Sequence, residues 1–221
     1  TVADVAPLTG VNRALVRQGL TVMARRERIG LAALADVAGL SAAPSVHALG
    51  YVLGPRVNAA GRVGKADLGA RLLATDDPAE AQALAERLHR HNEERRAIEA
   101  AVQAEAAAQA ESRMRGPLAW AAGEGWHPGV VGIVAARLVG ALGVPAVVVA
   151  MDGATGKGSA RSVAGVDLGA AVQRLADEGL LLRGGGHRMA AGLTVERAKL
   201  GPAMERLAEL LARQGAGAGG P

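Results

Sequence analysis

Residues 184–192 read Gly-Gly-Gly-His-Arg-Met-Ala-Ala-Gly, and this stretch dominates the interpretation of the sequence. Three consecutive glycines allow positive φ angles and let backbone N–H groups approach a ligand with no Cβ in the way. We expect Met189–Ala191 to form one turn of helix, followed by a short strand over 193–195. A glycine turn that leads into a helix N-terminus favours a bound anion, whereas the alternative is a flexible hinge with a surface histidine. The candidate phosphate-binding residues are Gly185, Gly186 and His187.

The composition limits the class of protein. A chain of 221 residues can bury one large hydrophobic core or two modest ones. Hydrophobic residues make up 50% of the chain but aromatic residues only 1%, so the core must consist mainly of Ala, Val and Leu. The absence of cysteine excludes disulfides and thiolate metal sites and fits a cytoplasmic protein. The longest nearly apolar run, 138–151, is shorter than the ~20 residues that a membrane helix needs.

The charge is unevenly distributed along the chain. The net charge is +4, and Lys and Arg outnumber Asp and Glu in residues 1–76 and 114–221, whereas acidic residues prevail in 77–113. Most of the basic residues are arginine, which suits bidentate phosphate contacts. A GC-rich genome would produce the same arginine bias, so this count alone does not decide the function.

The clearest secondary-structure pattern is a long helix over 77–113. Asp77 is a good N-cap and Pro78 a good first helical residue, and no Gly or Pro follows until the helix ends. Its apolar stripe is interrupted, because residues 89–96 are all polar. We expect a connecting helix whose ends pack on different domains and whose centre, with solvated His89 and His91, lies in solvent. A coiled-coil dimer is the alternative.

Alternating strand and helix patterns follow Gly116-Pro117 and predict an α/β domain with a central sheet. The expected strands are 118–122, 145–151, 157–163 and 193–195, and the expected helices are 128–142, 167–178 and 202–213.

Two motifs in this domain carry candidate binding residues. Gly125–Gly129 lies between a strand and its helix, where ligands collect in such sheets. There Trp126 could stack on a base or belong to the core, and His127 could donate to a phosphate or cap the helix. Gly158–Ser162 places hydroxyl groups and a guanidinium on one strand, with Ser159 and Arg161 as the candidates.

The first 76 residues predict smaller elements. We expect a strand-like segment over 1–8, a helix over 12–20 that is capped by Asn12, and a helix over 31–37. Residues 46–53 are ambiguous between helix and strand and are expected to end at Gly54-Pro55.

An amide and a guanidinium follow in the next segment. Asn58 and Arg62 are four residues apart around small residues, so both side chains could reach one phosphate. An asparagine turn with an exposed arginine is the alternative.

Four motifs together resemble the DHH phosphoesterase family, in particular its single-stranded-DNA-specific 5′→3′ exonucleases. The resemblance runs from Thr1 to about Arg213. The four motifs are Pro55–Arg62 (PRVNAAGR), Gly125–Gly132 (GWHPGVVG), Gly158–Ser162 (GSARS) and Gly184–Gly192 (GGGHRMAAG).

The resemblance implies a fold and a set of roles. It implies an α/β fold made of the end of a DHH catalytic domain (1–76), a long connecting helix (77–113), a DHH-associated nucleic-acid-binding domain with a mixed sheet (114–213) and a flexible tail (214–221). Arg161 and His187 would hold one stretch of DNA backbone together, and Arg62 and Asn58 the strand end. Asp4 would be one ligand of an Mn²⁺ or Mg²⁺ site whose other family ligands have no counterpart here.

The expected function is therefore the substrate-binding part of an exonuclease that releases 5′-mononucleotides in DNA repair and recombination. One aspartate cannot assemble a two-metal centre, so this chain alone should be inactive. The expected partners are single-stranded DNA and a single-strand-binding protein or helicase, with a monomeric chain and no membrane. The alternatives are a tRNA-binding module like the terminal domain of alanyl-tRNA synthetase, and an oligonucleotide or cyclic-dinucleotide phosphodiesterase.

Overall fold

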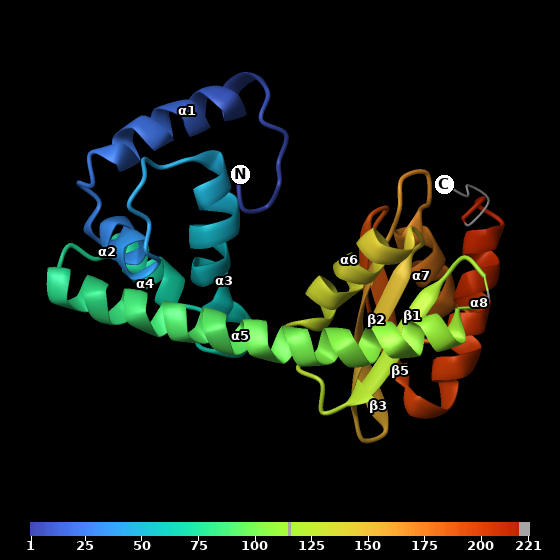
Figure 1. The fold of residues 1–221 in the computed structure, drawn as a ribbon. Coiled ribbons are helices and arrows are strands. Elements are labelled where there is room, and N and C mark those ends of the chain that lie inside the picture. Colours follow the sequence, from blue (N-terminus) through green and yellow to red (C-terminus); the bar gives the residue numbers. More distant parts are fainter. Residues whose placement is uncertain (115, 217–221) are drawn as a thin grey trace. The chain divides into compact units, whose positions relative to one another are not determined.

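The computed structural model describes residues 1–114 and 116–216, which form two units, residues 1–97 and 98–221 (Figure 1). The first is entirely helical and the second is an α/β unit, so the mixed α/β class predicted from the sequence is confirmed. The flexible tail expected over 214–221 falls mainly on 217–221, which lie outside the described part of the chain. No helix within 1–114 and 116–216 combines the length and the apolar character needed to cross a membrane.

The helical unit packs short helices around a leucine core. Its elements are α1 (Gly10–Ala24), α2 (Ile29–Val37), a π-helical turn η1 (Ala48–Leu53), α3 (Gly54–Val63), α4 (Leu68–Ala74) and the first part of α5 (Pro78–Arg113). The α2 and α4 backbones approach closely at Gly30, where a Cβ would lie 1.8 Å from the Leu72 carbonyl oxygen. The core contains Leu34, Leu53, Leu68, Leu72, Leu84 and Leu88.

Three expectations for this unit are wrong. Residues 1–8 form turns and no strand, and the described residues of the helical unit contain no strand with which they could pair. Gly54-Pro55 does not end the helical segment, because the π-helical turn η1 runs directly into α3 and the proline lies in the first positions of α3. The N-cap of α1 is Thr9, and the Asn12 amide instead donates to the Pro7 carbonyl oxygen.

Helix α5 has the bounds that the sequence predicted, but its centre does not lie in solvent. The Asp77 carboxylate accepts from the Ala79 N–H at 2.8 Å and so caps the helix. Asn92, Arg95 and Glu99 are 3%, 9% and 1% exposed. Burial of these polar groups is tolerated because Arg95 donates to Asn92 Oδ1 at 2.9 Å and Glu99 forms an ion pair with Arg137 of the α/β unit.

The α/β unit is a five-stranded mixed sheet with the order β1-β2-β3-β5-β4. The parallel pair β1 (Ala119–Glu124) and β2 (Ala146–Asp152) is joined by α6 (Val131–Leu142), and the other neighbours are antiparallel. Its remaining elements are β3 (Thr155–Arg161), α7 (Leu168–Asp177), β4 (Arg183–His187), β5 (Ala190–Glu196), a 3₁₀ turn η2 (Arg197–Lys199) and α8 (Leu200–Ala212).

Each face of the sheet has its own core. On one face α7 and α8 pack on the sheet through residues such as Val147, Leu168, Leu193 and Leu207. On the other face α6 and the second part of α5 pack on β1 and β2 through residues such as Val102, Val134 and Val148. Alternate residues of β1 and β2 therefore belong to different cores, as the period of two in a strand requires, whereas β3 and β5 contribute only to the core on the α7 and α8 side.

The glycine stretch forms a β-hairpin and not a turn that leads into a helix. Gly185 pairs with Gly192 and His187 with Ala190, and only Arg188 and Met189 form the turn. None of the three glycines has a positive φ. Gly186 is required by close approach instead, because a Cβ there would lie 2.3 Å from the Ala190 carbonyl oxygen. The expected helix and its N-terminal anion site are therefore wrong.

Candidate nucleic-acid interface

The sheet register brings Arg161 and His187 into one row. Arg161 pairs with Ala190 on β5, and Ala190 pairs with His187 on β4. Directly paired residues of antiparallel strands point to the same side of a sheet. Arg161 and His187 therefore lie on the same side of the sheet at the same end of their strands, although they are far apart in sequence.

Two further rows complete a surface that we call the open face. Ser159 pairs with Gly192, which pairs with Gly185, and the last row joins Lys157, Thr194 and Arg183. Gly192 is exposed, and a Cβ built on it would meet no atom within 4 Å. The nine residues are Lys157, Ser159 and Arg161 of β3, Ala190, Gly192 and Thr194 of β5, and Arg183, Gly185 and His187 of β4.

The open face has a small-residue centre and basic side chains at both ends. Its middle row carries only glycine and a serine hydroxyl, so a polymer backbone can lie close to the sheet. The outer rows each end in two basic or imidazole side chains, which suit phosphate groups. The sequence interpretation missed Lys157 and Arg183, although the alternation of residues 157, 159 and 161 already placed Lys157 on the side of Ser159 and Arg161.

Arg161 is held against the first turn of α6. Its Nη1 donates to Ser159 Oγ and to the Ala160 carbonyl oxygen, both at 2.8 Å. A Cβ on Gly132 would lie 2.9 Å from Arg161 Nη2 and 3.0 Å from Ser159 Oγ, so the absence of a side chain at Gly132 permits this packing.

This arrangement concentrates positive potential. The N-cap residue of α6, Val130, makes no side-chain cap bond, and the first turn of α6 contains no acidic residue. A guanidinium and the positive end of a twelve-residue helix therefore converge. An anion placed between them would be stabilised by both, which makes this the best-defined candidate phosphate site on the open face.

The hairpin turn is anchored by backbone hydrogen bonds. The Ser162 N–H donates to the Met189 carbonyl oxygen at 3.0 Å, and the Leu168 N–H donates to that of Arg188 at 3.1 Å. Gly169 of α7 allows close packing, since a Cβ there would lie 2.9 Å from the His187 carbonyl. His187 itself is exposed, so its position is fixed by the backbone while its ring can contact a ligand.

Trp126 does not provide an open stacking surface. It is 7% exposed, and its Nε1 donates to Glu105 Oε2 of α5 at 2.9 Å. The ring lies against Gly123, where a Cβ would be 2.1 Å from ring carbon Cε2. Of the two roles considered for Trp126, the structure favours the core role.

His127 has a defined tautomer. Its Nδ1 accepts from the Gly129 N–H at 3.0 Å, so in the neutral ring the proton is on Nε2. His127 therefore caps the loop before α6 and retains one donor for a ligand.

The candidate residues of the helical unit are exposed. Asn58 and Arg62 lie one turn apart on α3, and Asp4 lies on a turn near the N-terminus. Within residues 1–114 and 116–216 no three His, Cys, Asp or Glu side chains are grouped so as to hold a metal ion. Asp4 alone does not meet the needs of Mn²⁺ or Mg²⁺, so any metal that it binds requires further ligands.

Two histidines expected to be solvated are instead half-buried in this unit. Arg56 Nε donates to His89 Nδ1 at 3.1 Å, and Arg56 Nη1 donates to the Val52 carbonyl oxygen at 2.8 Å. Burial, reinforced by the nearby charge of Arg96, lowers the pKa of Arg56. The His91 ring lies against Gly64, where a Cβ would be 2.8 Å from Nε2. These contacts fix the end of α3, which carries Arg62, to α5.

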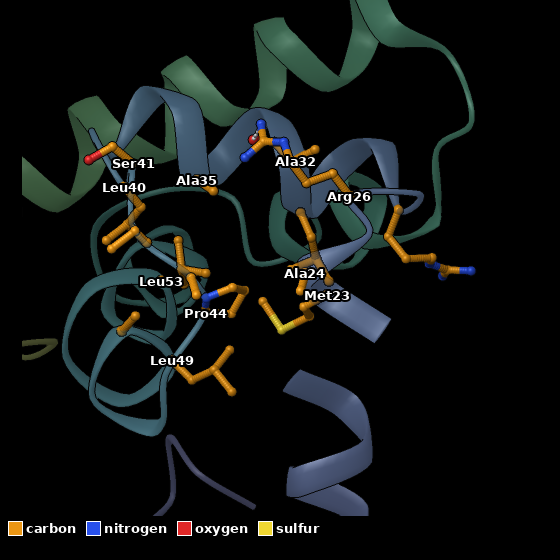
Figure 2. Close-up of a pocket in the computed structure, with 15 residues that line it drawn as sticks. Met23, Ala24, Arg26, Ala32, Ala35, Leu40, Ser41, Pro44, Leu49 and Leu53 are labelled. Carbon is orange, nitrogen blue, oxygen red and sulfur yellow. Dashed lines mark hydrogen bonds between the residues drawn. The ribbon is translucent and has the colours of Figure 1, made fainter. Parts of the chain in front are cut away.

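The helical unit also contains an apolar pocket of about 230 Å³. Figure 2 shows Met23, Leu40, Pro44, Leu49 and Leu53 around it, and Arg26, which forms a 2.6 Å ion pair with Asp36, at its edge. None of its lining residues is a histidine, aspartate or glutamate. We therefore assign no reaction to this pocket.

Comparison with known proteins identifies the region. The DHHA1 domain model matches residues 112–213. The chain is 42% identical over 212 residues to the single-stranded-DNA-specific exonuclease RecJ of Thermus thermophilus, covering 96% of the chain and 30% of that protein. It is 40% identical over 222 residues to RecJ of Escherichia coli, covering 96% of the chain and 38% of that protein.

Solved structures agree. The crystal structure of Thermus thermophilus RecJ with Mn²⁺ superposes with a TM-score of 0.87 at 39% identity, covering 96% of this chain and 31% of that one. A second RecJ structure bound to manganese gives a TM-score of 0.80 at 40% identity, and the match covers 96% of this chain and 53% of that one. The chain spans about a third of the length of the curated relatives it matches. The chain therefore corresponds to a region of RecJ proteins, the one that contains the DHHA1 domain.

Proposed function

We propose that this chain is the strand-binding part of a single-stranded-DNA-specific exonuclease. The observation that carries the proposal is the open face. There, basic side chains lie on both sides of a middle row that contains Gly192 and Gly185, and Arg161 lies against the N-terminus of α6. The parent enzyme would hydrolyse single-stranded DNA in the 5′→3′ direction to 5′-mononucleotides in DNA repair and recombination.

The open face would bind the sugar–phosphate backbone. Arg161, Ser159 and the first turn of α6 hold one phosphate, and His187 holds a neighbouring one across the sheet. Because these contacts involve charge and not base edges, binding should depend little on sequence and should weaken with salt.

The helical unit would hold the end of the strand and border the metal centre. Arg62 and Asn58 contact the terminal phosphate, and Asp4 supplies one metal ligand. When bound, Mn²⁺ or Mg²⁺ would activate water and neutralise the leaving oxygen. Since the described residues do not form the centre by themselves, the other ligands would come from other parts of the parent, and this chain alone would be inactive.

The domain assignment follows the same logic. Residues 1–76 would be the end of the DHH catalytic domain, 77–113 the connecting helix, and 114–213 the DHHA1 domain that binds DNA. We further propose a cytoplasmic monomer that cooperates with a single-strand-binding protein or a helicase.

The two alternatives are less favoured. The similar proteins are RecJ exonucleases, and neither alanyl-tRNA synthetase nor a cyclic-dinucleotide phosphodiesterase is among those described above. A clear preference of this chain for tRNA over single-stranded DNA would favour the synthetase-like module.

The test is a titration with labelled single-stranded DNA at several salt concentrations. Arg161→Ala and His187→Ala should each weaken binding by about tenfold, and Arg161→Ala should also reduce the salt dependence by about one phosphate contact. Arg213→Ala, which removes a charge just beyond α8, is the matched control and should bind as the unmodified chain does. Unchanged binding by both open-face variants would contradict the proposal.

A further inference from the structure

A hollow of about 440 Å³ opens beside the open face, where the carboxyl ends of β1 and β2 meet the start of β3. Its walls include Trp126, Pro128 and Met151, which are apolar, and the side chains around them are polar. All of its residues belong to the α/β unit. The polar residues at the hollow are Glu124, His127, Asp152, Thr155 and Lys157.

Lys157 belongs both to the hollow and to the open face. It follows Ser159 and Arg161 at every second position along β3, so consecutive side chains on this line are ~7 Å apart. This spacing is comparable with that of neighbouring phosphates in an extended single strand. A strand with one phosphate at Arg161 and Ser159 would therefore place a following phosphate near Lys157.

The charge pattern distinguishes what can enter the hollow. Lys157 is exposed, and its side-chain ammonium has no ion-pair or hydrogen-bond partner among the residues that the structure describes, so it can receive a phosphate at the rim. Glu124 is held in its ionised form, because hydrogen bonds from the Gly153 N–H and from Arg197 lower its pKa. Glu124 is paired with Arg197, but a second carboxylate, Asp152, also lines the hollow and would repel a phosphate placed inside it.

A nucleobase meets these requirements. It is neutral, its flat rings suit walls formed by a tryptophan, a proline and a methionine, and its edges carry both donors and acceptors. The His127 ring offers an Nε2–H donor because its Nδ1 is occupied by the Gly129 N–H. The Asp152 carboxylate offers an acceptor, whereas both Glu124 oxygens already accept from Gly153 and Arg197.

We infer that this hollow is a subsite for one base of the bound single strand, with the phosphate of the same nucleotide on Lys157. The inference rests on the proposed function, since it places one nucleotide of the strand that the open face holds. It assigns Trp126 to the wall of the subsite and not to an exposed stacking surface.

The experiment combines a variant that fills the hollow with a DNA strand that lacks one base. Thr155→Trp places a large side chain in the hollow, because Thr155 is exposed and lines it. Ala154→Trp adds the same bulk at the neighbouring exposed residue, which does not line the hollow, and is the matched control. The probe is a labelled oligothymidine of about 12 nucleotides, with a single abasic site moved along it.

The unmodified chain should lose about five- to tenfold in affinity when the abasic site reaches one particular position. Thr155→Trp should bind the intact strand as weakly as the unmodified chain binds that abasic strand, with no further loss at the same position. Ala154→Trp should behave as the unmodified chain does. Lys157→Gln should weaken binding of intact and abasic strands alike and lower the salt dependence.

Two results would overturn the inference: no position at which the base matters, or a Thr155→Trp variant that binds intact and abasic strands as the unmodified chain does. A base subsite would also be excluded if the Thr155→Trp variant bound every strand, including the abasic one, more weakly than the unmodified chain by the same factor. Failure of the proposed function looks different, because Arg161→Ala and His187→Ala would then leave the affinity for every strand unchanged.

Discussion

The two units of this chain differ in how completely they bury their own helices. In the helical unit α1 buries none of its fifteen residues, and Leu15 is 64% exposed. In the α/β unit both faces of the sheet carry their own core, and the three helices α6, α7 and α8 all contribute buried residues. The comparison indicates that the DHHA1 region buries its own hydrophobic residues, whereas α1 gains little stabilisation from packing on the rest of this chain.

The largest expected effect concerns the α/β core. Leu168→Ala removes a fully buried side chain at the start of α7 and should lower the free energy of unfolding by about 2–5 kcal/mol. Leu15→Ala on α1 should change it by less than about 0.5 kcal/mol. Urea unfolding followed by far-ultraviolet circular dichroism measures both effects, because the signal comes from the helices of both units. Equal effects of the two substitutions would refute the contrast between the units.

The hairpin offers a sharper comparison between two glycines of one motif. A side chain at Gly186 would meet the facing strand at 2.3 Å, whereas nothing lies within 4 Å of a Cβ on Gly192. Gly186→Ala should therefore destabilise the α/β unit by about 1–3 kcal/mol, and Gly192→Ala by much less. Thermal unfolding monitored by circular dichroism measures both. Equal tolerance at the two positions would mean that the hairpin is not as closely paired as described.

A smaller effect concerns pH. The Arg206 and Arg174 guanidinium groups lower the pKa of Glu178 to about 2 and so link α7 to α8. A carboxylate with a depressed pKa stabilises the fold above its ordinary pKa near 4.5, and this contribution is lost as the pH falls toward 2. Because the pair is exposed to solvent, Glu178→Gln should only slightly flatten the acid side of a stability profile. The same profile measured at high salt serves as the control, and a variant with an unchanged profile would exclude this linkage.

The sequence predicted the elements that local signals define. Asp77 and Pro78 fixed the start of α5, and the continuous apolar run of β2 identified a buried strand. The sequence did not predict the β4–β5 hairpin, because glycine has low strand propensity and its role there is to permit close approach of a facing strand. Burial of Asn92 and Glu99 was also missed. Glu99 is buried together with Arg137, a partner that is distant in sequence, and Asn92 accepts from Arg95 one turn away on the same helix.

The candidate site was predictable in part. Arg161 and His187 were identified through the resemblance, and the register then placed them in one row. Lys157 and Arg183 were missed because their membership of the open face depends on strand pairing. The close approach of α6 to Arg161 could not be read from the sequence either, since it depends on Gly132 facing β3 in the folded unit.

The central claim is that single-stranded DNA lies on the open face of the sheet. The most direct measurement is a titration of the isotope-labelled chain with oligothymidine, followed by backbone amide chemical shifts in nuclear magnetic resonance spectra. The account predicts that shifts concentrate in residues 157–161 and 183–192 and in the first turn of α6. Shifts confined to α7 and α8 on the opposite face, or none at saturating DNA, would contradict it.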